Sequence, residues 1–397
     1  MGRSVHRRAA LVAGAALWVA GSLACNAILG NEPVSLEPPP SSGRDATPDV
    51  TSNSDASCSG DLTTDRKNCG ACGHDCLEGA CDRGVCQPFV VTTSPSPPTL
   101  LAVDEAGNVF FASVDGTIRR CTVPRCDAPT VVTRLPLEAG SIYPSGMVAR
   151  GGVVYVAEQA SGTIFMCAAT GCAAPSVLVS GFNTIFGLAV DDTSIYFASI
   201  LGSFVARCAL PACAGGPIKM TQRAGYGFLG VVQDDANVYF YRGPFSDAGN
   251  YNPFTTAAVE RLPKNAADAA PATLATGTFA TNYYSNVAVR GDTLFIGESR
   301  GDAGAGSGVL SRVSLTAPGA PVPIVSNAAP FASLVVGERD AYWLSYADGH
   351  IRRCSIDGCA APSIVTAAGE ARYGVVQSST AVYWSENTSS RIAGVAK

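Results

Sequence analysis

Short apolar runs alternate with turn residues along most of the chain. Residues 186–213 show the unit: an apolar run, an Asp-Asp-Thr turn, a second apolar run, a Gly-Ser break, a third run and a Cys-x4-Cys pair. Two apolar runs of strand length around a turn of Asp and Thr predict a strand-turn-strand. Residues 217–220 can supply a fourth strand, so we expect each unit to be a four-stranded meander.

Seven copies of this unit align on an aromatic residue of the second strand. Consecutive copies are 41 to 56 residues apart, close to the period of a four-stranded propeller blade. The aligned aromatics are Phe110, Tyr155, Tyr196, Tyr239, Phe295, Tyr342 and Tyr383. The first strands align as short apolar runs at 101–103, 147–149, 188–190, 231–233, 287–289, 334–336 and 375–377. The pattern predicts an all-β, seven-bladed β-propeller, with six or eight blades as alternatives and a solenoid as the competing fold.

The two ends of the repeat array favour a closed ring. After Trp384 only one more strand fits, residues 391–396, so the last blade lacks its outer strand. Residues 88–93, just before the first copy, form a spare strand without a blade of its own. We expect this N-terminal strand to complete the last blade, because closure removes exposed sheet edges.

Composition and charge narrow the class of partner. The chain of 397 residues is 47% hydrophobic and 15% charged, with 42 Gly and 25 Pro, which is typical of many short strands and turns. The net charge is −5, and removing Arg3, Arg7 and Arg8 with a leader would bring it to −8. No other cluster of Lys or Arg occurs, so nucleic acid and anionic membrane surfaces are poor partners.

Residues 1–24 have the pattern of a secretory signal. Arg3, Arg7 and Arg8 precede an uncharged run rich in Ala, Val and Leu, which ends in Ser-Leu-Ala before Cys25. The stretch resembles a bacterial lipoprotein signal, and the resemblance implies that Cys25 is acylated. An uncleaved anchor that extends to about residue 31 and simple secretion are the alternatives. All three place the rest of the chain outside the cytoplasm, and we expect an outer-membrane lipoprotein, periplasmic or surface-exposed.

The remaining chain divides into three parts. Residues 25–57 carry Cys25 and a linker rich in Pro, Ser and Asp, which we expect to be disordered. Residues 58–87 form a six-cysteine module that is too small for an apolar core and must be stapled by disulfides. Residues 88–397 form the propeller.

The fifteen cysteines support export to an oxidising compartment. Cys25 stands alone, and six cysteines lie in the module: Cys58, Cys69, Cys72, Cys76, Cys81 and Cys86. The other eight recur as four blade pairs: Cys121/Cys126, Cys167/Cys172, Cys208/Cys213 and Cys354/Cys359. We expect each blade pair to staple the hairpin between the third and fourth strands, for about 2 to 3 kcal/mol each.

The module allows two interpretations. Six cysteines can pair in fifteen ways, and the sequence does not choose among them. Cys69, Cys72, His74 and Cys76 also have the spacing of a zinc site, although an oxidising compartment would compete for the thiolates. The Asn-Cys-Gly-x-Cys-Gly-x-x-Cys run, followed by a propeller, resembles secreted lipoproteins abundant in myxobacteria. That resemblance implies location and architecture, not a chemistry.

One face of the ring is the candidate binding surface. In propellers, the loop before each first strand and the loop after each second strand emerge on the same face. These positions carry aromatic and charged residues: Tyr143, Glu158, Phe186, Phe228, Arg242, Tyr284, Glu298, Phe331, Tyr373 and Glu386. They could hold a sugar, a peptide or a cation; alternatively, the aromatics fill gaps between blades and the acids bond to loop amides. Blades four and five carry Gly-rich and Asp-rich insertions at 243–256 and 300–308, where specificity can reside.

Two resemblances bear on that choice. The propeller is similar to NHL- and YWTD-type propellers, and residues 341–345 and 382–386 resemble the Tyr-Trp-Thr-Asp repeat, in which the acid chiefly ties one blade to the next. Streptogramin lyases and calcium-dependent lactonases are also seven-bladed, and they need histidines or converging carboxylates near the channel. Only His350 falls in this propeller, in a turn that we expect at the surface. Asp104, Asp191 and Asp234 recur in turns where Asp is favoured for backbone reasons.

The sequence therefore predicts a monomeric, lipid-anchored propeller of the cell envelope that binds a protein or a glycan. We expect no catalytic residue, no metal site and no cofactor, with a structural cation left open. A metal-dependent hydrolase or lyase is the first alternative and predicts at least three carboxylates at the central channel. A purely structural envelope protein is the second, and it predicts a channel mouth plugged by side chains.

Overall fold

The computed structural model describes residues 60–136, 144–182, 184–244, 256–278, 286–300, 307–345, 347–366 and 371–397. They belong to one compact unit, Ala56–Lys397. The expected signal, Cys25, the linker and Cys58 lie outside the described residues. The secondary structure assigned to the described residues is strand and turn, and none of it is a helix that could cross a membrane.

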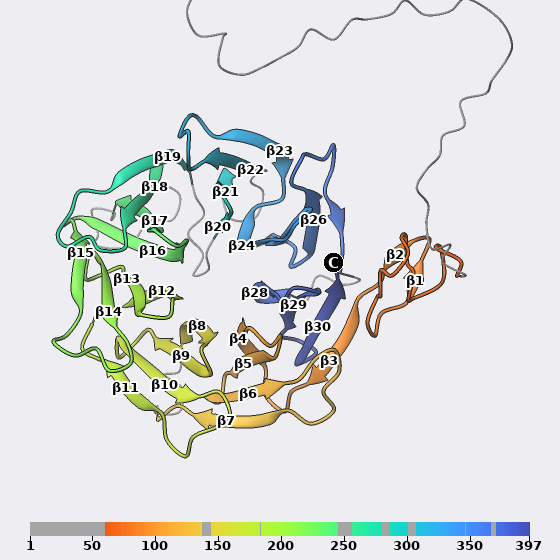
Figure 1. Ribbon diagram of the computed structural model, residues 1–397, viewed down its shortest axis with the longest axis horizontal. Helices are drawn as coiled ribbons and strands as arrows, with labels where there is room; N and C mark the ends of the chain where they lie inside the picture. The colour runs from red at the N-terminus through yellow and green to blue at the C-terminus, as the bar shows by residue number, and fades with distance from the viewer. Residues whose placement is uncertain are drawn as a thin grey trace, which may run out of the picture. The chain divides into compact units, whose positions relative to one another are not determined.

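Seven four-stranded antiparallel sheets surround a common axis (Figure 1). Blade 1 consists of β4 (Pro98–Val103), β5 (Val109–Ser113), β6 (Thr117–Cys121) and β7 (Thr130–Arg134). Blade 2 consists of β8 (Pro144–Arg150), β9 (Val153–Glu158), β10 (Thr163–Ala168) and β11 (Ser176–Val179). Blade 3 consists of β12 (Ile185–Val190), β13 (Ser194–Ser199), β14 (Phe204–Ala209) and β15 (Ile218–Gln222). Blades 4 and 5 consist of β16 (Tyr226–Gln233), β17 (Asn237–Pro244), β18 (Thr256–Pro263) and β19 (Ala272–Thr278); and β20 (Val287–Arg290), β21 (Thr293–Arg300), β22 (Ser307–Ser314) and β23 (Val322–Ala328). Blade 6 consists of β24 (Phe331–Val336), β25 (Asp340–Ser345), β26 (Ile351–Ser355) and β27 (Ser363–Ile364). The predicted seven-bladed propeller is confirmed.

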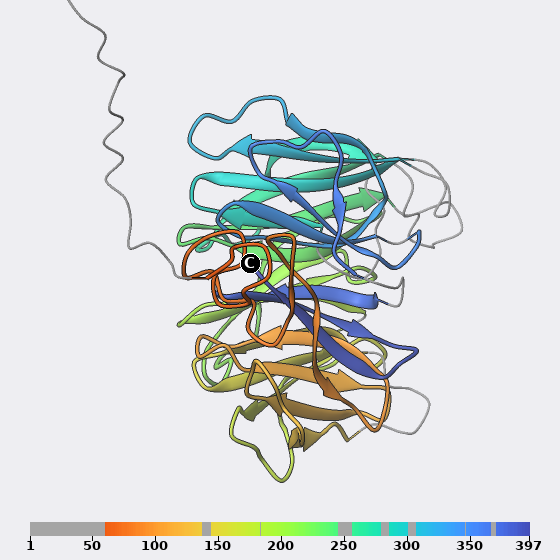
Figure 2. The same ribbon diagram turned by 90° about the vertical axis from the view of Figure 1, so that its right-hand side faces the viewer.

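Blade 7 joins the two ends of the propeller. It contains β28 (Ala371–Gln377), β29 (Ala381–Glu386), β30 (Arg391–Ala396) and, as its outer strand, β3 (Phe89–Thr93). Phe89 pairs with Gly394 and Thr93 with Arg391, so β3 runs antiparallel to β30 (Figures 1 and 2). A Cβ on Gly394 would lie 2.7 Å from Cδ1 of Tyr383, so the ring of this aromatic packs where a side chain would otherwise project. The predicted closure is confirmed.

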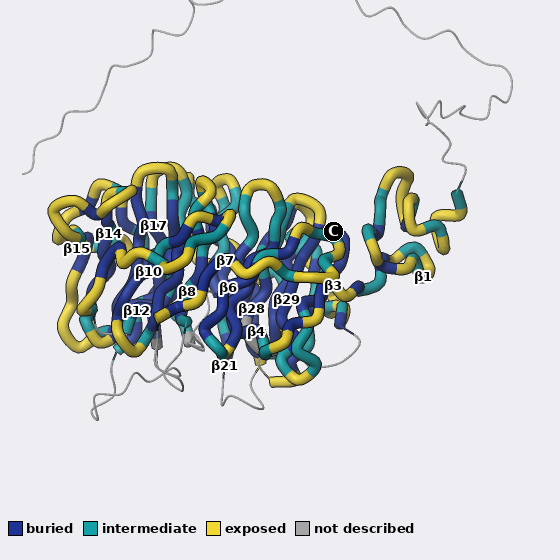
Figure 3. Tube along the Cα trace, turned by 90° about the horizontal axis from the view of Figure 1, so that it is seen from below, coloured by how far each residue is buried: buried dark blue, intermediate teal, exposed yellow. Residues whose placement is uncertain are grey.

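The apolar pattern of each blade follows from its neighbours. The second strands carry the aligned aromatics between adjacent sheets, and Phe110, Tyr196, Tyr239, Tyr342 and Tyr383 are all at most 2% exposed. Burial is concentrated in the strands, whereas the exposed residues gather in the connections (Figure 3). Burial of these rings supplies much of the driving force for packing blade against blade.

Hydrogen bonds between blades recur at the ends of the first strands. Gln233 Nε2 donates to the Val190 carbonyl of blade 3 at 3.2 Å, and Gln377 Nε2 donates to the Val336 carbonyl of blade 6 at 2.9 Å. The two glutamines occupy the same position of β16 and β28, the last residue of the strand. Each therefore links its blade to the preceding one through a buried carbonyl that would otherwise need another partner.

The outer hairpins carry the predicted disulfides. Cys121–Cys126, Cys167–Cys172, Cys208–Cys213 and Cys354–Cys359 each join residues five apart. In blades 1 and 2 the second cysteine also donates its amide to the outer strand of the preceding blade. Cys126 N lies 2.8 Å from Val91 O, and Cys172 N lies 2.9 Å from Val132 O. These hairpins thus fasten neighbouring blades at the rim.

The cysteine-rich module contains the short hairpin β1 (Cys81–Asp82) and β2 (Val85–Cys86). Cys69 pairs with Cys81 and Cys76 with Cys86, and Cys72 is also disulfide-bonded. His74 Nδ1 lies 2.5 Å from the Cys69 carbonyl oxygen. The zinc alternative is wrong for this oxidised form, because its cysteine ligands are held in disulfides and its histidine contacts the backbone.

Candidate functional site

Two faces of the ring must be distinguished. The insertion face is the end at which first strands begin and second strands finish, and the turn face is the opposite end, where first strands finish. The insertions predicted at 243–256 and 300–308 connect β17 to β18 and β21 to β22, so both belong to the insertion face. Most of each insertion, together with Tyr143 and Tyr284, lies outside the described residues, as does the Tyr373 side chain.

The phenylalanines expected on the insertion face are buried inside strands. Phe186, Phe228 and Phe331 are at most 2% exposed and pack in cores between neighbouring blades. For these three residues the structure supports the interpretation that the aromatics fill gaps between blades, and the alternative of accessible rings is wrong. The strands begin earlier than the sequence suggested, so these side chains point into the gap between blades. Phe228 meets Phe240 edge to face, and Phe331 stacks on Trp343.

The acids of the insertion face hold their own hairpins. Glu158 is fully buried; it accepts the Ala160 amide at 3.0 Å, and both the amide and the hydroxyl of Ser161, at 2.6 and 2.7 Å. Glu386 accepts Trp384 Nε1 at 3.1 Å and forms an ion pair with Arg391 at 2.5 Å. Both carboxylates are the last residues of second strands, where they close the following turn.

Ion pairs recur at equivalent hairpins of other blades. Arg119 pairs with Asp115 in blade 1 at 3.4 Å, and Arg352 pairs with Asp348 in blade 6 at 2.6 Å. The hydrogen bond from Arg352 holds the pKa of the Asp348 carboxyl well below its usual range. Glu298 is partly buried within β21. Charged residues at these strand ends therefore act first as supports of the face.

Blade 4 differs, because its charged residues meet an aromatic ring near the surface. Arg242 Nε lies 2.7 Å from Oε1 of Glu260, and the Arg242 guanidinium lies 4.6 Å from the centre of the Tyr226 ring. The guanidinium of Arg223 lies over the same ring at 4.5 Å. Arg242 and Tyr226 are diagonal neighbours on one side of the sheet, since Phe228 pairs with Arg242 and Tyr226 with Pro244.

A tight turn brings the second arginine to the ring. The Tyr226 amide donates to the Arg223 carbonyl at 3.3 Å, and Gly225 has a φ of 80°. A positive φ at the third residue is what a type II turn requires, and glycine adopts it without strain. The motif Arg-Ala-Gly-Tyr at 223–226 was the signal that sequence reasoning missed. Only Arg242 of this group was predicted for the face.

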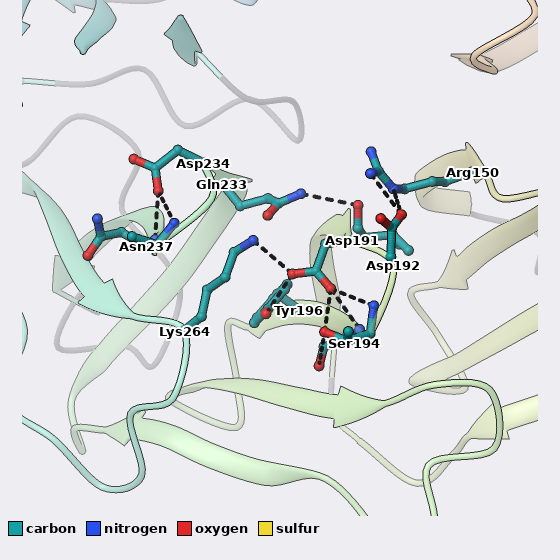
Figure 4. Close-up of polar contacts among 12 residues, drawn as sticks. Arg150, Asp191, Asp192, Ser194, Tyr196, Gln233, Asp234, Asn237 and Lys264 are labelled. Atoms are coloured by element: carbon teal, nitrogen blue, oxygen red, sulfur yellow. Dashed lines mark hydrogen bonds and ion pairs between the residues drawn. The ribbon is translucent and has the colours of Figure 1, made fainter. Parts of the chain in front are cut away.

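The acids of the turn face also have structural roles (Figure 4). Asp191 accepts the Thr193 and Ser194 amides, the Tyr196 hydroxyl at 2.9 Å and Lys264 Nζ of blade 4 at 2.8 Å. Burial alone would raise the pKa of Asp191, but these hydrogen bonds hold it well below its usual range.

The neighbouring blade repeats much of this arrangement. Asp234 accepts the Ala236 and Asn237 amides, at 2.8 and 2.6 Å, and the Tyr239 hydroxyl. Burial and the hydrogen bond to Asp191 raise the pKa of Tyr196 to about 12. The recurring aspartates are thus turn residues, consistent with the backbone reason given for them above.

The central channel is lined by the first strands of all seven blades. It encloses a cavity of about 360 Å³, and its wall is mainly Val, Leu and glycine. The polar side chains among its described lining residues belong to Ser145, Ser333, Gln233 and Gln377. The Oε1 atoms of both glutamines are buried without a hydrogen-bond partner. The described lining thus offers amide and hydroxyl groups, with no carboxylate and no histidine among them.

His350 does not lie at the channel. It is partly buried, and its Nδ1 lies 2.9 Å from Oγ1 of Thr366. The expected surface position is therefore only partly correct, since this contact ties the histidine to the segment after β27. Among the described residues, the one group of three potential metal ligands within reach of one another is Cys69, Cys76 and Cys86, and all three are in disulfides.

Comparison with known structures identifies propellers of diverse function. Virginiamycin B lyase from Staphylococcus aureus matches 78% of this chain and 98% of its own, at 13% identity and a TM-score of 0.58. YCF48 bound to D1 peptide matches 78% and 96%, at 10% identity and a TM-score of 0.54. The WD40 propeller domain of Doa1 matches 78% and 95%, at 10% identity and a TM-score of 0.51. The likeness is one of fold alone. No protein-family model and no curated protein matches the sequence.

Proposed function

We propose that this protein is an exported, lipid-anchored propeller of the cell envelope, and that it binds a protein or a glycan through its insertion face. In this proposal Cys25 carries the lipid and attaches the chain to the membrane. The protein acts as a monomer, and binding needs no cofactor.

The observation that carries the proposal is that the carboxylates of both faces are engaged in bonds that support the fold. Glu158, Glu386, Asp191 and Asp234 are engaged by turn amides, hydroxyl groups or cations of the fold. Carboxylates held in this way keep loops and seams rigid, and a rigid scaffold with variable loops is the arrangement that supports recognition. The insertions occur in two blades on one face, which favours that face over the other.

The two alternatives are less well supported. A metal-dependent hydrolase or lyase would need carboxylates meeting at the channel, whereas the described channel wall is apolar with amide and hydroxyl groups. A purely structural protein predicts a channel mouth closed by side chains, and the partly open cavity of about 360 Å³ between the first strands speaks against that closure. Metal that remains bound after dialysis would favour the hydrolase.

Capture from envelope extracts tests the proposal. The mature chain would be immobilised beside a variant with Tyr284→Ala and Tyr373→Ala, the two tyrosines that the sequence assigns to the insertion face. Asp192→Asn is the matched control, because Asp192 is 86% exposed on the turn face. We expect the double variant alone to lose partners. Identical captured sets for all three proteins would contradict the proposed face.

A further inference from the structure

We infer that Arg223, Tyr226 and Arg242 form a docking site for carboxylate side chains of an acidic protein segment, at the junction of blades 3 and 4. This inference rests on the proposed binding function and names the chemistry of one contact within it. The three residues are called the arginine–tyrosine site below.

The first argument is the state of the two guanidiniums. The Arg242 side chain is 15% exposed; its Nε bonds Glu260, and its two terminal nitrogens have no hydrogen-bond partner in the described part of the chain. Arg223 is exposed, and its guanidinium contacts the Tyr226 ring without an ion pair among the described residues. Each guanidinium lies against the Tyr226 ring, and its planar fork of N–H donors matches carboxylate oxygens, which arginine binds in pairs of parallel bonds.

The second argument is that the site is preorganised. The turn at 223–226 fixes Arg223 relative to Tyr226, and the sheet register fixes Arg242 on the same ring. Glu260 is only 2% exposed, and its ion pair with Arg242 fixes the position of that guanidinium. Its other oxygen, Oε2, is buried without a partner. Burying a carboxylate with one oxygen unpartnered destabilises the folded protein. Such a residue is retained where it has a role, and here that role is to position Arg242.

The third argument is charge. The chain has a net charge of −5, yet this junction presents two arginines against one buried carboxylate. Because the two arginines outnumber the one buried carboxylate, the junction is locally cationic and attracts the carboxylates of an acidic segment.

The composition favours a protein over a glycan. Tyrosine and arginine are enriched where proteins dock, whereas sugar recognition needs an open aromatic face for stacking. Here two guanidiniums already lie over the Tyr226 ring. Leu201, which is 54% exposed, lies in the β13–β14 turn, whose Ser203 carbonyl accepts the Arg223 amide. Leu201 stands two residues before Ser203 in the chain and adds exposed apolar area to this turn, as a protein interface would use.

A binding experiment with defined probes tests the inference. Hexaglutamate peptide, hexaglutamine peptide and an oligogalacturonate would be titrated against the full mature chain at low and at physiological salt. Arg223→Gln removes the exposed charge, and Arg242→Lys keeps a charge beside Glu260 but removes the fork. Arg134→Gln is the matched control, because Arg134 is exposed at the end of β7, near the corresponding corner of blade 1.

We expect hexaglutamate to bind in a salt-sensitive manner and hexaglutamine not to bind. Arg223→Gln and Arg242→Lys should each weaken binding roughly tenfold, and Arg134→Gln should leave it unchanged. Preferred binding of oligogalacturonate, equal loss in the control, or no binding of hexaglutamate would overturn the inference. Circular dichroism and melting curves would show that the variants are folded.

The same variants separate this inference from the proposed function. If Arg223→Gln captures the wild-type partners from envelope extracts and the double tyrosine variant does not, the insertion face binds without the arginine–tyrosine site. If neither variant changes the captured set, both proposals fail.

Discussion

The outer hairpins of blades 3 and 4 are stabilised in different ways at the same buried position. In blade 3, Cys208 faces Ile195 across the strand pair and closes a disulfide with Cys213. In blade 4 the equivalent partner of Val238 is Leu262, which is 1% exposed and packs in the core between the two blades. The position is therefore a buried apolar site first, and a covalent staple only where the sequence places cysteine there.

Blade 4 replaces the staple with contacts to its neighbour. The Asp268 and Ala269 amides donate to the Lys219 and Met220 carbonyls of β15, at 3.0 and 2.8 Å, and Lys264 reaches Asp191. Blades 5 and 7 also have an apolar residue in place of the first cysteine, Val313 and Val395 respectively. The comparison teaches that the seams between blades depend on packing, while the disulfides add local closure.

The largest expected effect comes from the unstapled position. Leu262→Ala should lower the free energy of unfolding by about 3 kcal/mol, because it removes buried contacts and leaves a cavity between blades 3 and 4. Urea unfolding followed by near-ultraviolet circular dichroism measures the change. A loss below that of the disulfide variant described next would reverse the ranking of packing over staple.

Removing one staple should cost less. Cys208→Val with Cys213→Ala keeps an apolar side chain at the buried site and deletes only the covalent closure. We expect a loss of about 2 kcal/mol, since the loop is short and the entropy of closing it is small. The variant binds the same probes as the wild type if the hairpin only stabilises the rim. Unchanged stability would show that packing alone fixes the hairpin.

The stability of the seam between blades 3 and 4 should depend on pH. The pKa of Asp191 is depressed in the folded state, so its stabilising contribution is complete above the unfolded pKa of about 4 and is lost as pH falls below it. Asp191→Asn should therefore remove on the order of 1 to 2 kcal/mol near neutral pH and flatten the acid branch of the stability curve. Melting curves of both proteins from neutral to acid pH give the difference, and parallel curves would contradict this role.

The exposed ion pair between blades 2 and 3 should matter least. Arg150 and Asp192 are 2.9 Å apart, but their side chains are 37% and 86% exposed. Arg150→Ala should change stability by less than about 0.5 kcal/mol, and salt should reduce even that. A larger loss would mean that the seam between blades 2 and 3 depends on this exposed pair and not on its buried contacts.

Much of the fold could be read from the sequence, because propeller blades repeat a local pattern. The aromatic of each second strand, the apolar first strands and the spare strand at 88–93 together predict the blade register. The blade disulfides followed from their equivalent places. The pairing in the module did not follow, since spacing alone cannot choose among fifteen arrangements.

The candidate face was harder to predict, because side-chain direction depends on where a strand begins. Phe186, Phe228 and Phe331 were assigned to loops but lie within strands, so they point between blades. Glu260 was missed because a lone acid in a strand gives no signal without its partner eighteen residues away in Arg242. Arg223 was missed because its turn joins two blades and belongs to neither repeat.

The pairing of β3 with β30 has a consequence for how the protein is made. Strand β3 leaves the ribosome before every other strand of the ring, yet its hydrogen-bonding partner is the final one, Arg391–Ala396. Until those residues arrive, Phe89 and Val91 have no β30 to cover them, although both are nearly buried in the finished ring. A truncated chain therefore keeps an unpaired strand edge with exposed apolar side chains, which quality-control proteases can recognise. Only the full-length chain covers this edge.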